Sequence, residues 1–180
     1  MPVMAIIGTI GRDLEYPGQL TFKGIARSQG GVMEVKELGH IVLYVRDLEV
    51  SRGFYRDVLG WKEIAGIEHQ MAMFSSGRTH HELLLIEVGP DAAPIPPGRR
   101  VGLYHFGLKV GTSDQELREA LHALEEAGAN IAGSADHRVT HSLYITDPDG
   151  NEIELYIDVQ PEVWREDPEA VLAPTRALRL

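Results

Sequence analysis

The sequence contains no cysteine among its 180 residues. This absence excludes disulfides, thiolate zinc sites, iron–sulfur clusters and a cysteine nucleophile, and it fits a reducing, cytoplasmic location. The eight histidines are therefore the soft metal ligands that the chain can offer. No apolar run approaches the roughly 18 residues that span a bilayer, so we expect no membrane partner.

Basic residues are in the minority. There are 17 Lys and Arg against 27 Asp and Glu, which gives a net charge of −10. Nucleic acid would meet an unfavourable overall field, so we do not expect it as a partner. With 43% hydrophobic and 24% charged residues, the composition is that of an ordinary folded domain.

The N-terminal part differs from the rest, and residues 1–36 are predicted to be an extension. Its short apolar stretch, residues 5–10, has no basic residue before it and no small-residue cleavage site after it, so it is a poor signal peptide. The pattern sharpens after it. Residues 37–161 are predicted to form one domain, and residues 162–180 a C-terminal tail.

The domain is predicted to contain one structural unit twice: a strand, a helix and three further strands. The first copy, module one, covers residues 37–90, with strands at 38–45, 61–65, 71–75 and 82–88 and a helix at 48–59. Asp47 is placed to cap that helix and Gly60 to end it. Val50, Phe54, Tyr55 and Val58 form its expected apolar stripe.

The second copy, module two, covers residues 101–161 and follows a loop rich in proline and glycine. Its strands are expected at 102–110, 130–132, 142–146 and 153–159, and its helix at 113–127. Ser113 and Glu116 have the spacing of a capping box at the start of that helix. A repeat of this kind suggests a site shared by two halves across a pseudo-twofold axis.

Three residues could form a metal site at such an axis. His40 and His105 occupy matching places in the first strands of the two modules, and Glu154 lies on the last strand. Alternation puts Glu154 on the strand face opposite the core residues Ile153 and Leu155. A single strand histidine is more often structural, but two at repeat-related places favour a ligand role. Two imidazoles and one carboxylate form the facial arrangement of non-haem Fe(II) oxygenases.

Three segments carry a family resemblance. They read GHIVLYVRDLEVSRGFYRDVLGW at the start of the domain, YHFGLKV in the middle and SLYITDPDGNEIELY at the end. Residues 37–161 resemble the vicinal oxygen chelate superfamily, which contains glyoxalase I, bleomycin-resistance proteins and extradiol ring-cleaving dioxygenases. The resemblance implies an α+β fold in which two βαβββ modules form an eight-stranded, cup-shaped mixed sheet.

Within the superfamily, the match is best to small one-domain type I extradiol dioxygenases of the catechol 2,3-dioxygenase kind. By resemblance, His81 would be the acid/base that acts on bound dioxygen, and Tyr144, ten residues before Glu154, would hydrogen-bond the substrate oxygen. His137 is the best fit to a further catalytic histidine, with His141 as its competitor. The ion implied is Fe(II), and Mn(II) accepts the same ligands.

Glu82 is the candidate for a fourth ligand of the glyoxalase type. Laying residues 87–90 on residues 158–161 pairs Glu154 with Leu83, which turns Glu82 to the opposite face of the strand. A single bulge would undo this register, so the fourth ligand stays open. The register favours a three-ligand site.

The predicted function is Fe(II)-dependent cleavage of a catechol-type ring with incorporation of O2. One alternative is a glyoxalase-type lyase or isomerase that binds Zn(II) or Ni(II) through Glu82 and consumes no oxygen. Another is a non-catalytic small-molecule binding protein of the resistance type. A homo-oligomer, a dimer or higher, is expected.

Overall fold

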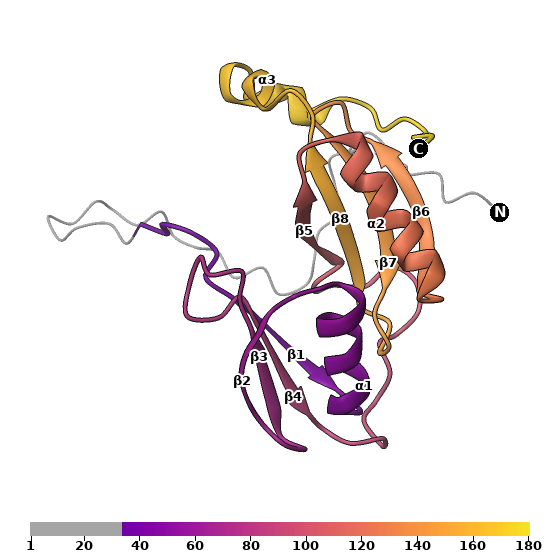
Figure 1. Ribbon diagram of the computed structural model, residues 1–180. Helices are drawn as coiled ribbons and strands as arrows, with labels where there is room; N and C mark the ends of the chain where they lie inside the picture. The colour runs from indigo at the N-terminus through magenta and orange to yellow at the C-terminus, as the bar shows by residue number, and fades with distance from the viewer. Residues whose placement is uncertain (1–33) are drawn as a thin grey trace, which may run out of the picture. The chain divides into compact units, whose positions relative to one another are not determined.

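The computed structural model describes residues 34–180 (Figure 1). Gly39–Leu180 forms one unit, and the chain before Gly39 belongs to another. Most of the predicted extension, residues 1–33, lies outside the described residues. From residue 34 to the end, no helix is long and apolar enough to cross a membrane.

The unit contains the two predicted repeats in the predicted order. Module one contains β1 (Ile41–Val45), α1 (Leu48–Gly53), the π-helical turn η1 (Phe54–Val58), β2 (Glu63–Ile67), β3 (Met71–Phe74) and β4 (Leu83–Glu87). Module two contains β5 (His105–Gly111), α2 (Asp114–Glu126), β6 (Asn130–Asp136), β7 (Thr140–Thr146) and β8 (Glu152–Asp158). The tail adds α3 (Pro161–Glu166) and the 3-10 helix η2 (Pro168–Leu172).

Each module folds into a four-stranded mixed sheet. The strand orders are β1-β4-β3-β2 and β5-β8-β7-β6, and the first strand of each module runs parallel to its last. This confirms the α+β fold class with eight strands in two βαβββ modules. No strand pairing joins the two sheets within residues 34–180, so β1 and β5 are both edge strands.

The predicted helix signals are confirmed. The side chain of Asp47 accepts a hydrogen bond of 3.0 Å from the backbone N–H of Val50. Ser113 and Glu116 form the reciprocal capping box, because the Glu116 N–H donates to the Ser113 hydroxyl at 3.3 Å while that hydroxyl donates to the Glu116 carboxylate at 2.8 Å. Gly60 ends the first helical segment with φ 67°, which favours glycine.

The predicted stripe of the first helix is wrong at Val50, which is 55% exposed. Tyr55 is buried as predicted, and Leu48 and Ser51 share its face at the i, i+3, i+7 spacing of a regular helix. Val50 lies in α1, before the helix changes to a π-helical turn at Phe54.

Alternation on the strands holds as predicted. On β8 the side chains of Ile153, Leu155 and Ile157 are buried, while those of Glu152 and Glu154 lie on the other face. The buried face packs with α2, which Figure 1 shows lying along the second sheet. Each fully buried side chain of this size contributes about 1.5–3 kcal/mol relative to exposure. Burial of one face of β8 therefore fixes the orientation of the strand, so that Glu152 and Glu154 lie on the face away from the core.

A buried hydrogen bond links the two modules. The Tyr55 hydroxyl donates to Oδ2 of Asp147 at 2.8 Å, and both residues are buried. Burial, and then the charge of Asp147, raises the pKa of Tyr55. Asp147 also accepts from the backbone N–H of Asn151 at 2.7 Å, so it fixes the turn that leads into β8. Arg46 of module one binds Asp149 of the same turn at 3.0 Å.

Candidate metal centre

His105 and Glu154 lie together on β5 and β8. Parallel pairing sets His105 beside Glu152 and Gly107 beside Glu154. The Nε2 atom of His105 lies 3.3 Å from Oε2 of Glu154. Its Nδ1 atom lies 3.5 Å from Oε1 of Glu152, and it is buried without a hydrogen bond. Two of the three predicted ligands are therefore neighbours.

The carboxylate of Glu154 is held from one side. Its Oε1 atom accepts a hydrogen bond of 2.6 Å from the Ser142 hydroxyl and one of 3.2 Å from the Tyr144 hydroxyl. Ser142 is fully buried. These bonds occupy Oε1 and leave Oε2 on the side of His105, where a metal ion could bind it.

Tyr144 belongs to a longer hydrogen-bonded chain. Nε2 of His137 lies 2.8 Å from the Tyr144 hydroxyl, and Nδ1 of His137 lies 3.2 Å from the Thr175 hydroxyl. Because Tyr144 donates its one proton to Glu154, His137 must donate from Nε2 and accept from Thr175 at Nδ1. Burial, and then the charge of Glu154, raises the pKa of Tyr144, so the phenol keeps its proton at neutral pH.

The structure separates the two competing histidines. His137 contacts Tyr144, whereas Nδ1 of His141 lies 2.6 Å from Asp114 at the start of α2. The tail reaches His137 because the backbones of Asp136 and Arg176 exchange two hydrogen bonds. Sequence reasoning passed over Ser142, although strand alternation with Tyr144 could have found it.

His40 lies in a different cluster. Its ligand atom and those of His80 and His81 are all within 4.8 Å of one another, and no other set of three histidine or carboxylate ligands within residues 34–180 meets this limit. The chain as described thus does not bring His40 together with both His105 and Glu154.

His81 is the inner member of that histidine cluster. Its ring centroid lies 4.5 Å from that of His40 and 4.4 Å from that of His80. Burial, followed by the charges of His80 and His40, lowers the pKa of His81. The lowered pKa favours the neutral ring, which can accept a proton or bind a metal.

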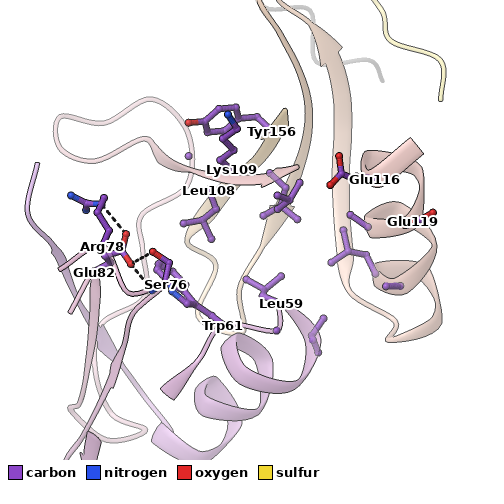
Figure 2. A pocket seen from close by; sticks show the side chains of 18 residues that line it. Leu59, Trp61, Ser76, Arg78, Glu82, Leu108, Lys109, Glu116, Glu119 and Tyr156 are labelled. Carbon is purple, nitrogen blue, oxygen red and sulfur yellow. Dashed lines mark hydrogen bonds and ion pairs between the residues drawn. The ribbon is translucent and has the colours of Figure 1, made fainter. Parts of the chain in front are cut away.

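Glu82 is engaged elsewhere. Its carboxylate accepts from the Ser76 N–H at 2.6 Å and pairs with Arg78 at 3.0 Å (Figure 2). The register predicted for it is wrong by one residue. Since Ile41 pairs with Leu83 and Phe106 with Ile153, the counterpart of Glu154 is Leu84, and Glu82 corresponds to Glu152.

A cavity of about 920 Å³ lies near Glu82 and is lined by side chains of both modules. Figure 2 shows Trp61 and Leu59 on one side, with Lys109 and Tyr156 above and the helix of Glu119 opposite. Glu82 lines it, whereas His105 and Glu154 do not. Gly107, which pairs with Glu154, also lines the cavity, so the cavity borders the strands that carry the His105–Glu154 pair.

The His105–Glu154 pair fits a metal ion on two observations. The donor set of imidazole nitrogen and carboxylate oxygen suits Fe(II) and Mn(II). Gly107 has no side chain, so the space beside the Glu154 carboxylate is open. A Cβ at this position would lie 3.7 Å from Oε2 of Glu154 and 3.2 Å from the Tyr156 ring. A side chain at position 107 would fill the space next to the ligand oxygen.

Sequence comparisons show similarity to proteins named as dioxygenases. It is 36% identical over 138 residues to a catechol-2,3-dioxygenase of Bacillus subtilis, covering 77% of this chain and 47% of that one. It is 30% identical over 122 residues to biphenyl-2,3-diol 1,2-dioxygenase 2 of Rhodococcus globerulus, covering 68% and 63%. The chain thus spans about half to two-thirds of the length of these relatives.

Solved structures and a family model agree with the fold. A lactoylglutathione lyase from Agrobacterium tumefaciens has a TM-score of 0.55 at 28% identity, and the match covers 73% of this chain and 98% of that one. Residues 37–155 match the model of the Glyoxalase/Bleomycin resistance protein/Dioxygenase superfamily. The match covers more than half of the chain, so the chain belongs to this superfamily.

Proposed function

We propose that this protein is a metal-dependent extradiol dioxygenase, which opens the ring of a catechol-type aromatic and incorporates both atoms of O2. The observation that carries the proposal is the Glu154 carboxylate, which lies 3.3 Å from His105 and is hydrogen-bonded by Tyr144, with His137 behind that tyrosine. The two dioxygenase relatives support the substrate class.

The proposed ligands are His105, Glu154 and His40, and the proposed ion is Fe(II), with Mn(II) as an alternative. When bound, the ion supplies Lewis acidity and orients the two diol oxygens and O2 side by side. Tyr144 is the proposed hydrogen-bond donor to the substrate oxygen, and its O–H would turn to the substrate from Oε1 of Glu154. His137 would keep the Tyr144 hydroxyl in place, and neutral His81 would accept and return a proton near the bound O2.

A second copy of the chain is the proposed source of His40. Because His40 does not lie with both His105 and Glu154 in the described chain, we infer that the third ligand comes from another copy. The edge strands β1 and β5 could receive another chain, and the side chains of Val42 and Tyr44 on β1 are 45% and 70% exposed. We therefore propose a homo-oligomer in which module one of one copy faces module two of another.

The function is tested by loading the protein with Fe(II) without oxygen, adding a panel of catechols and then admitting air. We expect a yellow ring-fission product and the uptake of one O2 per substrate. If no catechol in a broad panel is converted by metal-loaded protein, the proposal is wrong. Turnover of a hemithioacetal without oxygen uptake would indicate the lyase alternative, which the engagement of Glu82 by Arg78 and Ser76 disfavours.

A further inference from the structure

Three of the four histidines of module one form a set that the proposed centre does not use as a whole. His40 precedes β1, and His80 and His81 precede β4. Parallel pairing of these strands places Ile41 beside Leu83, so the chain ends that carry the histidines lie side by side. The fold of module one alone creates the cluster.

The spacing of the cluster suits a transition metal. All three ligand atoms lie within 4.8 Å of one another. Zinc–imidazole bonds of about 2.0–2.1 Å require nitrogens about 3.4 Å apart in a tetrahedral site. His40 and His80 are exposed, so rotation of their side chains can close this difference at little cost.

Two further observations, on His81 and on His80, favour metal binding over a structural role. Nε2 of His81 is buried and has no hydrogen-bond partner, a state that costs free energy unless something satisfies the atom. Nδ1 of His80 lies 3.1 Å from the Thr79 hydroxyl, which leaves Nε2 of that ring available. A ligand histidine is commonly oriented through its other nitrogen in this way.

The nearby carboxylate does not compete for the ion. Glu82 is bound to Ser76 and Arg78, so it is not free to join the cluster. The ligand set is three imidazole nitrogens, which suits Zn(II), Co(II), Ni(II) and Cu(II) better than Mg(II) or Ca(II).

We propose that His40, His80 and His81 form a metal site of their own, which binds Zn(II) or Co(II) without any residue of module two. This inference does not depend on the proposed function. The two share His40 and His81, because one His40 ring cannot serve two ions and a His81 nitrogen bound to an ion cannot accept a proton. An ion in the histidine cluster would withhold His40 from His105 and Glu154, and excess Zn(II) would then inhibit the enzyme.

The test uses Co(II), whose visible absorption reports imidazole coordination, and the full-length Glu154→Ala variant, which lacks the carboxylate of the proposed centre. We expect this variant to bind one Co(II) per chain. Adding His80→Ala should weaken Co(II) binding at least about tenfold. Adding His122→Ala is the matched control, because His122 is 72% exposed on α2, and it should leave binding unchanged.

Equal Co(II) affinity with and without His80 would overturn the inference, and so would a Glu154→Ala protein that binds no Co(II). Thermal unfolding of each variant checks that the fold is intact, and His80→Gln provides a second substitution of similar size. Catechol cleavage by the wild-type protein is measured separately. Its absence would refute the proposed function and leave the histidine site standing.

Discussion

The Ser142 hydroxyl donates a hydrogen bond of 2.6 Å to Oε1 of Glu154, and Ser142 is fully buried. The two residues lie on adjacent strands, β7 and β8, whose register also places Tyr144 directly beside Glu154. Glu154 therefore has one oxygen fixed by the second sheet and the other directed to His105. A metal bound there would find its carboxylate ligand already oriented.

Replacing Ser142 with Ala should weaken metal binding about 10- to 100-fold, the range seen when the hydrogen-bond partner of a ligand is removed. The reason is that Oε1 loses its shorter donor and the carboxylate can rotate. Metal titration of the protein measures the effect. Ser134→Ala is the control, since that exposed hydroxyl donates only to the Leu178 carbonyl. Unchanged affinity in the Ser142 variant would show that Tyr144 alone orients Glu154.

Replacing Tyr55 with Phe should lower the free energy of unfolding by about 1.5–3 kcal/mol, because it removes a buried hydrogen bond to a charged partner. Asp147 would lose the donor that lies 2.8 Å from its Oδ2 atom. Urea unfolding checks the value. The same change at Tyr44, which is 70% exposed, should stay within about 0.5 kcal/mol. Similar effects at the two positions would contradict the importance of this link.

The sequence predicted most of the fold because its signals are local. The Asp47 and Ser113 caps depend on residues three positions away, and the alternation of Ile153 and Leu155 on β8 needs only the strand itself. The π-helical turn over Phe54–Val58 had no such local signal, because periodicity assumes a constant number of residues per turn. Val50 lies in α1 before that turn, and it is exposed because the buried face runs through Leu48, Ser51 and Tyr55.

The candidate site was predicted in part for the same reason. The repeat predicted that His40 and His105 lie at the starts of β1 and β5, which pair with β4 and β8 in the same way. The ten-residue spacing of Tyr144 and Glu154 corresponds to a pair of directly opposite residues on β7 and β8. The distance between His40 and His105 depends on how two sheets are arranged, and no local pattern encodes that. Thr175 reaches His137 only through the path of the tail, so sequence spacing could not reveal the contact.

Replacing Glu82 with Gln should cost stability at neutral pH but not in acid. Burial tends to raise the pKa of Glu82, but hydrogen bonds from Ser76 and the ion pair with Arg78 outweigh it and hold the pKa below its usual 4.5. The stabilisation is therefore complete above the unfolded value and is lost as the pH falls through the folded value. Urea unfolding at several pH values should show the wild type and the variant converging below pH 4.5.

Glu68→Gln is the control for this pH dependence, because the Glu68 side chain is 82% exposed. Its stability should follow that of the wild type at every pH. A constant difference between Glu82→Gln and the wild type down to strongly acidic pH would mean that the ionised form of Glu82 is not what stabilises the loop.

Mixing two defective variants tests whether the metal centre draws ligands from two copies. The His40→Ala protein lacks the module-one ligand in every site, and the Glu154→Ala protein lacks the module-two ligand in every site. In a mixed dimer, one site combines His40 of one copy with His105 and Glu154 of the other. Random exchange at equal amounts should restore about a quarter of the wild-type sites.

The restored sites are measured by tightly bound Fe(II) and by catechol cleavage after the two variants have been unfolded and refolded together. The double variant that carries both substitutions on one chain, mixed with wild type, is the matched control. Its mixed dimers pair each wild-type module with a defective one and contain no intact site, so exchange should lower the intact sites from about half to about a quarter, whereas in the test mixture they should rise from none to about a quarter. Two variants that stay defective after verified exchange would place all three ligands within one chain. Module one would then have to move against module two and break the Tyr55–Asp147 bond that joins them.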